Sequence, residues 1–286
     1  MKYIFFGTPQ FAAIILLKLI QAGMPPALVV TNPDKPAGRK QELTSPAVKE
    51  RIKEKGLRIK VIQPERLTPD LFSDEEWDFF VVAAYGKIIP KSILEIPRLG
   101  TINVHPSLLP KYRGPTPIQT AILNGDAVTG VSLILLDREV DHGPILAERE
   151  HTMTYDDDYD TLAPKLAELG AEMLIEILPK YIAGKITPVP QDHAKATFTK
   201  KFTTADAEIS CEDLRAALEG NAKQAEHIHR MARALNPEPG TWVQADNNPP
   251  AGLPKNKRVK ILEVFVKGDT LKLARIQAEG KQPRDL

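Results

Sequence analysis

Asn103 and His105 stand two residues apart at the end of a short run, Gly100 to Val104, that predicts a β-strand. Side chains at positions i and i+2 of a strand share one face. Pro106 cannot donate to a ladder, so the strand is expected to end there. The sequence therefore predicts both side chains at the carboxyl end of a strand, where open α/β sheets bind ligands. The local alternative is a hydrogen-bonded turn histidine beside an asparagine that caps backbone groups.

A carboxylate follows the next predicted strand, which covers residues 129–136. Asp141 lies on the loop after it, just before Gly143-Pro144, and we expect it at the same edge of the sheet. An Asx turn at this position is the alternative. An amide, an imidazole and a carboxylate around one crevice can polarise a carbonyl, stabilise an oxyanion and move a proton, and none of them needs a metal. Because no Ser or Cys stands in a nucleophile elbow, direct transfer between two bound substrates is favoured.

The elements that must position these residues alternate along the first part of the chain. Short apolar runs predict strands at 3–6, 27–31, 58–62 and 79–84, and the stretches 10–22 and 45–55 predict helices. This order favours an α/β fold, a doubly wound, Rossmann-like and mostly parallel sheet. The first turn, Gly7-Thr8-Pro9, has one glycine in place of a G-x-G-x-x-G fingerprint, and the chain has no P-loop, so a nicotinamide enzyme is disfavoured.

A change of composition divides the chain. Gly184, Pro188 and Pro190 break the periodicity and lysines add charge, which is typical of a linker. Beyond it we expect a helix over 211–235 and strands over 259–266 and 270–276, in a small β-barrel-like (OB-like) domain. The predicted organisation is a catalytic domain at 1–184, a linker at 185–203 and a C-terminal domain at 204–286.

The composition excludes several classes of protein. Of the 286 residues, 42% are hydrophobic and 26% are charged, which is ordinary for a globular chain. Lys and Arg number 38 against 37 Asp and Glu, which excludes a broadly polybasic nucleic-acid coat but not a local basic patch. The single cysteine cannot form an intrachain disulfide, and no apolar run reaches the roughly 18 residues of a membrane span. We therefore expect a cytoplasmic protein with no membrane partner. We also expect a monomer.

Two longer motifs are similar to those of one known family. They are Asn103-x-His105-Pro106-Ser107-Leu108-Leu109-Pro110-x-Tyr112-Arg113-Gly114 and Val140-Asp141-x-Gly143-Pro144-Ile145-Leu146. Further matches are Phe6-Gly7-Thr8-Pro9-x-Phe11, Pro33-Asp34-Lys35-Pro36-Ala37-Gly38-Arg39, Ala83-Ala84-Tyr85-Gly86-x-Ile88-Ile89-Pro90, Gln191-Asp192 and Asn236-Pro237-x-Pro239-Gly240. Through nearly its whole length, the chain resembles the 10-formyltetrahydrofolate-dependent formyltransferase family.

The resemblance implies a role for each motif. Asn103, His105 and Asp141 would take the family's catalytic positions, and the tetrahydrofolate-binding segment would be Ser107, Leu108, Leu109 and Pro110. In the implied reaction, an amine attacks the formyl carbon of 10-formyltetrahydrofolate, which is a co-substrate. Asn103 and protonated His105 would stabilise the oxyanion, while Asp141 orients His105 and relays the proton from the amine to the departing folate nitrogen.

The loop and C-terminal matches favour the α-amine of initiator methionyl-tRNA as the acceptor. Arg39, Lys40, Lys200 and Lys201 are then candidate phosphate contacts, and a solvated charged loop is the alternative for the first two. Two other functions remain open. One is formyl transfer to the amine of a sugar nucleotide or a purine precursor, and the other is a folate-responsive RNA-binding module without turnover.

Overall fold

The computed structural model describes residues 1–37 and 42–286, and residues 38–41 lie outside the described part. The described residues form two compact units. Unit 1 consists of Met1–Pro115, Val128–Thr152 and Ala163–Phe198, and unit 2 consists of Thr116–Ala127, Met153–Leu162 and Thr199–Leu286. Within this described part, no helix is both long enough and apolar enough to cross a membrane.

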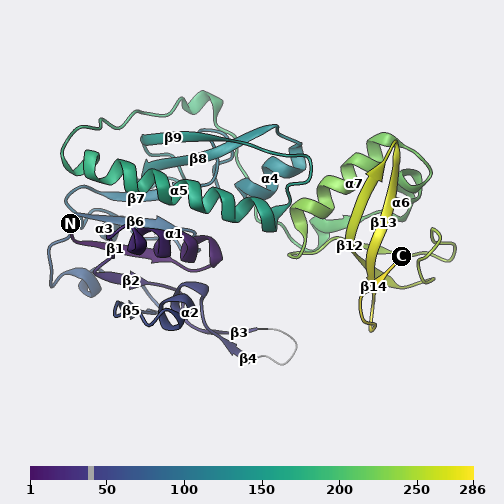
Figure 1. Cartoon of the computed structure of the whole chain (residues 1–286), viewed down its shortest axis with the longest axis horizontal. Helices are drawn as coiled ribbons and strands as arrows, with labels where there is room; N and C mark the ends of the chain where they lie inside the picture. The colour runs from purple at the N-terminus through teal and green to yellow at the C-terminus, as the bar shows by residue number, and fades with distance from the viewer. Residues whose placement is uncertain (38–41) are drawn as a thin grey trace. The chain divides into compact units, whose positions relative to one another are not determined.

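Unit 1 is built on a seven-stranded sheet with the order β5-β2-β1-β6-β7-β8-β9 (Figure 1). Its strands are β1 (Tyr3–Gly7), β2 (Leu28–Val30), β5 (Lys60–Ile62), β6 (Phe79–Ala83), β7 (Thr101–His105), β8 (Val128–Leu135) and β9 (Ile145–Thr152). The strands from β5 to β7 pair in parallel, whereas β8 is antiparallel to both β7 and β9. A separate antiparallel hairpin joins β3 (Lys35–Ala37) and β4 (Glu42–Thr44). The predicted mostly parallel α/β fold is confirmed.

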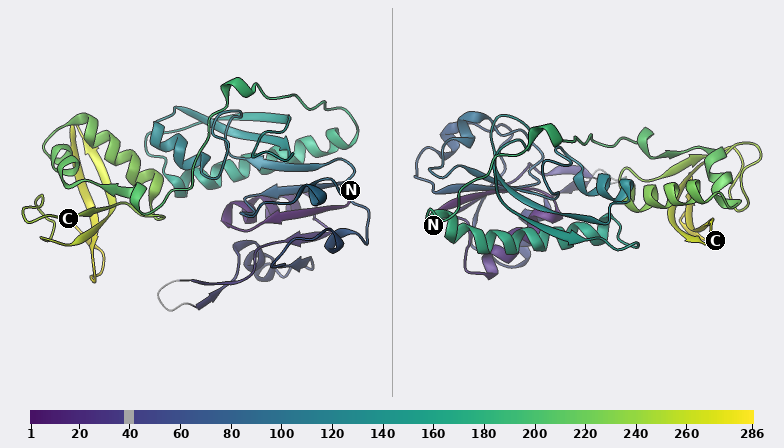
Figure 2. Two further views of the ribbon diagram at one scale, coloured as in Figure 1. Left: turned by 180° about the vertical axis from the view of Figure 1, so that it is seen from behind. Right: turned by 90° about the horizontal axis from the view of Figure 1, so that it is seen from above.

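Helices cover the sheet of unit 1. They are α1 (Gln10–Gln21), α2 (Ala47–Glu54), α3 (Lys91–Leu94) and α5 (Tyr159–Ile182), and α1 and α5 lie on the same face (Figures 1 and 2). Gly170 lets α5 approach the sheet, because a Cβ there would lie 2.6 Å from Val104 Cγ1. Val104 therefore points toward α5. Since side chains alternate along a strand, Asn103 and His105 point to the opposite face.

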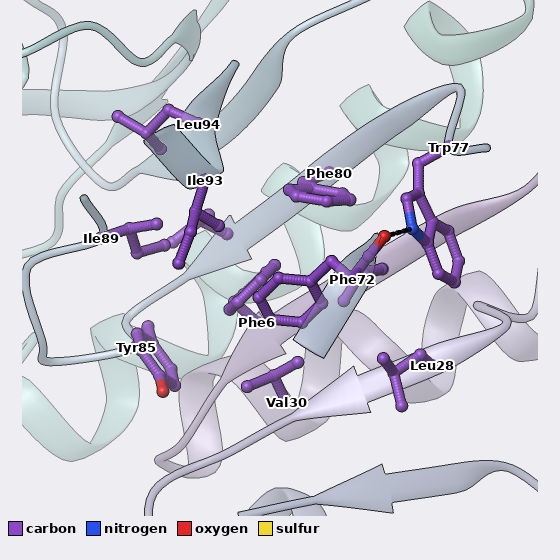
Figure 3. Packing of buried hydrophobic residues seen from close by; sticks show 12 residues of the cluster. Phe6, Leu28, Val30, Phe72, Trp77, Phe80, Tyr85, Ile89, Ile93 and Leu94 are labelled. Atoms are coloured by element: carbon purple, nitrogen blue, oxygen red, sulfur yellow. Dashed lines mark hydrogen bonds between the residues drawn. The ribbon is translucent and has the colours of Figure 1, made fainter. Parts of the chain in front are cut away.

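That opposite face carries a cluster of aromatic and aliphatic side chains (Figure 3). Its buried members are Ile4, Phe6, Leu28, Val30, Phe72, Trp77, Phe80, Val82, Tyr85, Ile89, Ile93 and Leu94. The indole nitrogen of Trp77 donates to Phe72 O at 2.9 Å, so its burial leaves no unpaired donor. Burial of each large apolar side chain stabilises the fold by about 2 kcal/mol. Leu136, in the loop after β8, packs against this cluster and so draws that loop onto the face of Asn103 and His105.

The direction of β8 corrects one step of the sequence argument. His105 pairs with Ser132 and Ile102 pairs with Leu135, so β8 ends beside the start of β7. The loop that carries Asp141 therefore begins beside the amino-terminal end of β7, whereas His105 lies at the carboxyl end of β7. Asp141 nevertheless lies beside His105, as the sequence predicted, with its Oδ2 3.5 Å from His105 Nδ1. Only the assumed parallel direction of the strand is wrong, so the loop must fold back across the sheet to bring Asp141 there.

Unit 2 contains a five-stranded sheet with the order β10-β11-β12-β13-β14. The strands are β10 (Glu208–Ile209), β11 (Trp242–Gln244), β12 (Arg258–Lys267), β13 (Thr270–Ala278) and β14 (Arg284–Asp285). The helices of this unit include α4 (Pro117–Asn124), α6 (Cys211–Leu218) and α7 (Ala222–Leu235), and α7 packs on β12 and β13. The predicted strands at 259–266 and 270–276 correspond to β12 and β13. The sheet has β10 and β14 at its edges. The predicted C-terminal β sheet is confirmed, and its barrel-like (OB-like) form stays a prediction.

The single helix predicted over 211–235 is two helices. Gly220 adopts a φ of +102°, which breaks the helical path. The side chain of Asn221 then caps α7 by accepting from Gln224 N at 3.2 Å, and Ser210 caps α6 by accepting from Asp213 N at 2.9 Å. Each cap stabilises its helix by about 1 kcal/mol, so two separate helices with a short turn replace the continuous one.

His229, on the buried side of α7, gives unit 2 a pH dependence. Its ring packs on Tyr155 with centroids 5.0 Å apart, and its Nδ1 has no hydrogen-bond partner among the described residues. Burial lowers the pKa of His229, and the neighbouring Arg233 guanidinium lowers it further. The folded state therefore resists the proton that the unfolded chain accepts near pH 6.5.

We expect the free energy of unfolding to fall as the pH drops below about 6.5, because the unfolded state then binds more protons. The contribution of neutral His229 is present above the unfolded pKa and is lost as the pH falls through the lower folded pKa. In His229→Gln, the decrease in Tm between pH 7.5 and 5.5 should be smaller than in the wild type. His227→Gln, at an exposed position of the same helix, is the control, and the same decrease in all three proteins would contradict the assignment.

Candidate active site

Three polar side chains from distant parts of the sequence meet on one face of unit 1. Asn103 Nδ2 donates to Asp141 Oδ1 at 3.2 Å, and Gly114 N donates to Asp141 Oδ2 at 2.8 Å. His105 Nδ1 lies 3.5 Å from the same Oδ2. His105 and Asp141 are buried. The structure thus brings together the amide, imidazole and carboxylate singled out in the sequence, and the amide of Asn103 bonds to the carboxylate rather than to backbone.

The second ring nitrogen of His105 has a fixed partner. Nε2 lies 2.9 Å from Tyr112 O. Because a backbone carbonyl oxygen can only accept, Nε2 carries the proton in this contact. Nδ1 is therefore the nitrogen that can gain or lose a proton, and it is the one that faces Asp141.

The loop that carries Asp141 folds back across the sheet to reach β7. Asp141 itself adopts a φ of +48°, in a region that Asp tolerates better than most residues. Gly143 is required nearby because a Cβ there would overlap Leu135 O. The Asx turn of this loop is made by Asp137, whose Oδ1 accepts from Glu139 N at 2.8 Å, and not by Asp141. The Asx turn that was the alternative role for Asp141 is therefore formed by Asp137.

A cavity of about 330 Å³ lies between α3 and this loop. Its lining residues are Lys91, Leu94, Glu95, Leu136, Asp137, Arg138, Glu139 and His142. Leu94 and Leu136 also pack in or against the core cluster, so the cavity has an apolar part and several charged groups. These lining residues were not predicted from the sequence. No motif marks them, because two segments that are distant in sequence form the lining only after folding.

Tyr85 is a further titratable group on this face. Burial raises the pKa of Tyr85 to about 12, so its hydroxyl keeps its proton at neutral pH and does not serve as a base. Its backbone oxygen accepts from Thr8 Oγ1 at 3.1 Å and from Asn32 Nδ2 at 2.9 Å. Tyr85 thus ties the first turn of the chain to the strand ends beside the core cluster.

The expected folate segment, Ser107 to Pro110, is packed against β8. Ser107 Oγ donates to Lys111 O at 2.6 Å, and Leu109 N donates to Ser132 Oγ at 3.0 Å. Leu108 contacts the strand at Gly130, where a Cβ would lie 3.0 Å from Leu108 Cγ. The hydroxyl of Ser107 is therefore engaged within the protein, and the segment offers chiefly apolar side chains.

Of the four basic residues predicted to contact phosphates, the structure describes two, Lys200 and Lys201. Arg39 and Lys40 lie outside the described residues. Lys200, in unit 2, forms an ion pair with Asp206, and hydrogen bonds from Lys200 and Thr203 hold the pKa of Asp206 well below its usual range. Lys201 is exposed and has neither a hydrogen bond nor an ion pair with any described residue.

A doubly wound sheet that brings an amide, an imidazole and a carboxylate together on one face defines an α/β enzyme suited to acyl transfer or proton transfer. Residues 1–178, more than half of the chain, match the family model described as "Formyl transferase". The chain therefore belongs to the formyl transferase family.

Curated relatives extend the similarity beyond the matched domain. The methionyl-tRNA formyltransferase of Chloroflexus aurantiacus is 42% identical over 247 residues, which are 85% of this chain and 76% of the relative. That of Nitrosospira multiformis is 45% identical over 244 residues, or 84% of this chain and 74% of the relative. That of Enterococcus faecalis is 40% identical over 246 residues, with shares of 85% and 75%.

Solved structures share the fold at lower sequence identity. Methionyl-tRNA formyltransferase from Clostridium thermocellum has a TM-score of 0.60 and 16% identity, and the match covers 97% of this chain and 98% of that one. An N-formyltransferase from Helicobacter canadensis, in complex with folinic acid and dTDP-3-aminofucose, has a TM-score of 0.62 and 18% identity, with coverage of 93% and 88%. At these identities the likeness supports the fold alone.

Proposed function

We propose that this protein transfers the formyl group of 10-formyltetrahydrofolate to the α-amine of initiator methionyl-tRNA. The chemistry is supported by the convergence of Asn103, His105 and Asp141 on one face of unit 1, and the loop that carries Asp141 also lines a cavity. The choice of acceptor is supported by relatives that are about 40% identical over most of the chain and are named for this reaction. The reaction requires a polar site that binds a formyl oxygen and accepts a proton from an amine.

Asn103 is placed to bind the formyl oxygen. One hydrogen of its amide nitrogen is used by Asp141 Oδ1, and the other has no partner among the described residues. An N–H already oriented by a carboxylate costs little reorganisation when negative charge develops on an oxygen in front of it. Asn103 thus serves as an oxyanion donor held in position by Asp141.

His105 and Asp141 manage the proton. A proton on His105 Nδ1 faces the Asp141 carboxylate at 3.5 Å, a separation longer than a normal hydrogen bond. The imidazolium N–H can therefore be shared with an oxyanion. Asp141 takes up the proton that the attacking amine loses and passes it to the folate nitrogen, which leaves as its bond to the formyl carbon breaks. Asp141 is placed for this relay because its buried carboxylate is held by two hydrogen bonds on the face that carries Asn103 and His105.

The folate donor would occupy the cavity beside the Asp141 loop. Leu94 and Leu136 can contact the faces of a flat ring, and the carboxylate of Glu139 can accept from its N–H groups. The segment from Ser107 to Pro110 would supply an apolar wall rather than a hydroxyl hydrogen bond, since Ser107 Oγ already donates to Lys111 O.

Further proposals concern the rest of the chain. Residues 1–184 would form the catalytic domain, with 185–203 as the linker and 204–286 as the tRNA-binding domain. Arg39, Lys40, Lys200 and Lys201 would contact the acceptor. Because charged initiator tRNA is a substrate of translation, we place the reaction in the cytoplasm, and we propose a monomer.

The deciding experiment is incubation of the protein with 10-formyltetrahydrofolate and charged initiator tRNA, followed by mass analysis of the amino acid released from the tRNA. Formylmethionine should appear in proportion to enzyme and time. Turnover of a sugar-nucleotide or purine-precursor amine with no product on tRNA would replace the proposed acceptor. Tight folate binding without transfer to any amine would favour a non-catalytic RNA-binding module.

Acceptor binding should depend steeply on salt if the acceptor is a tRNA, because neutralised phosphates release counterions. We expect Lys201→Ala to reduce the slope of log affinity against log salt by up to about 1, since its ammonium has no partner among the described residues. Lys200→Ala should change the slope less, because Lys200 is paired with Asp206. Filter binding of charged tRNA at several salt concentrations measures both slopes, and a flat dependence in the wild type would contradict a phosphate-rich acceptor.

A further inference from the structure

Gln191 is a buried amide that touches the backbone of the Asp141 loop. Its Nε2 donates to Asp141 O at 2.9 Å and to Gly143 O at 2.7 Å. These two carbonyls lie on either side of His142, directly after Asp141, the residue with a φ of +48°. Gln191 therefore fixes the loop at the point where its backbone must turn for the carboxylate to reach Asn103.

A buried guanidinium orients the amide of Gln191. Arg113 donates to Gln191 Oε1 from Nε at 3.1 Å and from a terminal nitrogen at 2.6 Å, and the same terminal nitrogen lies 2.8 Å from His193 Nδ1. His193 stacks on His142 with ring centroids 4.0 Å apart and planes within 4°. Because the Arg113 guanidinium has only donors, it can bond to the amide oxygen of Gln191 but not to the amide nitrogen. The amide nitrogen of Gln191, with both of its hydrogens, therefore faces the Asp141 loop.

The segment that carries Gln191 is itself attached on both sides. Before it, Val189 and Ile145 exchange two backbone hydrogen bonds of 2.8 Å each. After it, Thr197 O accepts from Arg113 N at 2.9 Å, and Thr197 Oγ1 accepts from Tyr112 N at 2.8 Å. Residues 189–197 therefore connect the loop of Asp141 with the segment whose Tyr112 oxygen binds His105.

We propose that Gln191 is a positioning residue for the reaction, which holds the Asp141 carboxylate against Asn103 and His105 through the two backbone carbonyls. Arg113 acts behind it by fixing the orientation of the amide. The inference rests on the proposed function for its kinetic consequence. Its structural consequence, the placement of the carboxylate, is independent of which acceptor is used.

The side-chain chemistry points to a specific variant. Gln191→Glu keeps the size of the side chain and an acceptor for Arg113, but it removes both N–H donors. Two carbonyl oxygens would then face a carboxylate, so the loop should move away from it. Displacement of a catalytic group by about 1 Å can cost about 100-fold in rate. We therefore expect Gln191→Glu to lower kcat about 10-fold to 100-fold, with the KM for folate and for tRNA changed less than about threefold.

The matched control is Asp192→Asn, the next residue, whose side chain is exposed and bonds to Ala194 and Lys195. It should retain kcat within about twofold. Gln191→Met removes the donors and the acceptor without adding a charge, so it shows whether the effect of Gln191→Glu is due to its new negative charge. We expect the kcat of Gln191→Met to fall as much as that of Gln191→Glu. Wild-type kcat in both Gln191 variants would overturn the proposal. So would a loss of activity that only follows a loss of folded protein in thermal melts.

A double-mutant cycle separates positioning from general stability. In the Asp141→Asn background, measured by single turnover with enzyme in excess, Gln191→Glu should cost less than about threefold, because the group it positions is already gone. A cost equal to that in the wild type would refute the proposal.

A crystal structure of Gln191→Glu supplies a readout without turnover. The Asp141 carboxylate should lie beyond hydrogen-bond distance of Asn103, and an unchanged distance would also overturn the inference. If the wild type formylates no amine, the proposed function fails, and this structure still decides the positioning role.

Discussion

Asp141→Asn is expected to lower kcat for formyl transfer by at least about 100-fold while the protein remains folded. Both carboxylate oxygens of Asp141 accept hydrogen bonds, from Asn103 Nδ2 and from Gly114 N. An amide has one acceptor oxygen, so one of these donors would face an NH₂ group. The amide also cannot take up the proton that the attacking amine must lose. The loss should therefore appear in kcat at saturating folate and tRNA.

The measurement is the initial rate of formylmethionyl-tRNA formation, with Glu150→Gln as the control for loss of an acidic side chain. Glu150 is exposed on β9 in the same unit, and its variant should keep the wild-type rate. Near-normal turnover of Asp141→Asn would show that the proton leaves by another route.

His105→Ala is expected to lower the rate by at least about 100-fold as well. It removes the ring whose Nδ1 faces Asp141 at 3.5 Å and whose Nε2 contacts Tyr112 O at 2.9 Å. Loss of the contact between the ring and Tyr112 O should also cost about 1–3 kcal/mol of stability. A domain of ordinary stability tolerates this loss at 25 °C, because its free energy of unfolding is about 5–15 kcal/mol.

His105→Gln distinguishes the two roles of the ring. A glutamine can restore a donor to Tyr112 O, and so recover part of the Tm, but it cannot carry a proton between Asp141 and the substrate. We expect its Tm to exceed that of His105→Ala and its kcat to stay about as low. His227→Ala, at an exposed site on α7, is the control for histidine loss. A His105→Gln enzyme with wild-type kcat would remove His105 from proton transfer.

The sequence was sufficient for features that depend on neighbouring residues. The alternation of apolar runs and helical stretches predicted the strands of the parallel part of the sheet, and β7 (Thr101–His105) lies within one residue of its expected bounds. Placement of Asn103 and His105 on one face followed from the two-residue period of a strand. The break between α6 and α7 was missed, although Gly220 and Asn221 are residues that end and cap helices.

The predicted linker, residues 185–203, is a segment whose contacts could not be predicted from its composition. Gly184, Pro188 and Pro190 marked residues 185–203 as a connection, and composition contains nothing about what such a connection touches. In the structure, residues 163–198 belong to unit 1, and Gln191 lies buried between Arg113 and the Asp141 loop. An amide with two donors and one acceptor acquires its role only from the three groups around it.

The sequence by itself determined the fold class and the placement of Asn103 and His105 on one face of a strand, because strand periodicity and turn residues act over a few positions. The motif that contains Asp141 was identified by its resemblance to a known family. Only the tertiary structure decided how Asp141 reaches the other two. The strand before it, β8, runs antiparallel to β7 and ends beside the start of β7, away from His105. The packing of Leu136 and the close approach of backbone at Gly143 bring the loop back toward Asn103 and His105. Strand direction and loop path depend on hydrogen bonds and packing between residues distant in the chain, which local patterns do not encode.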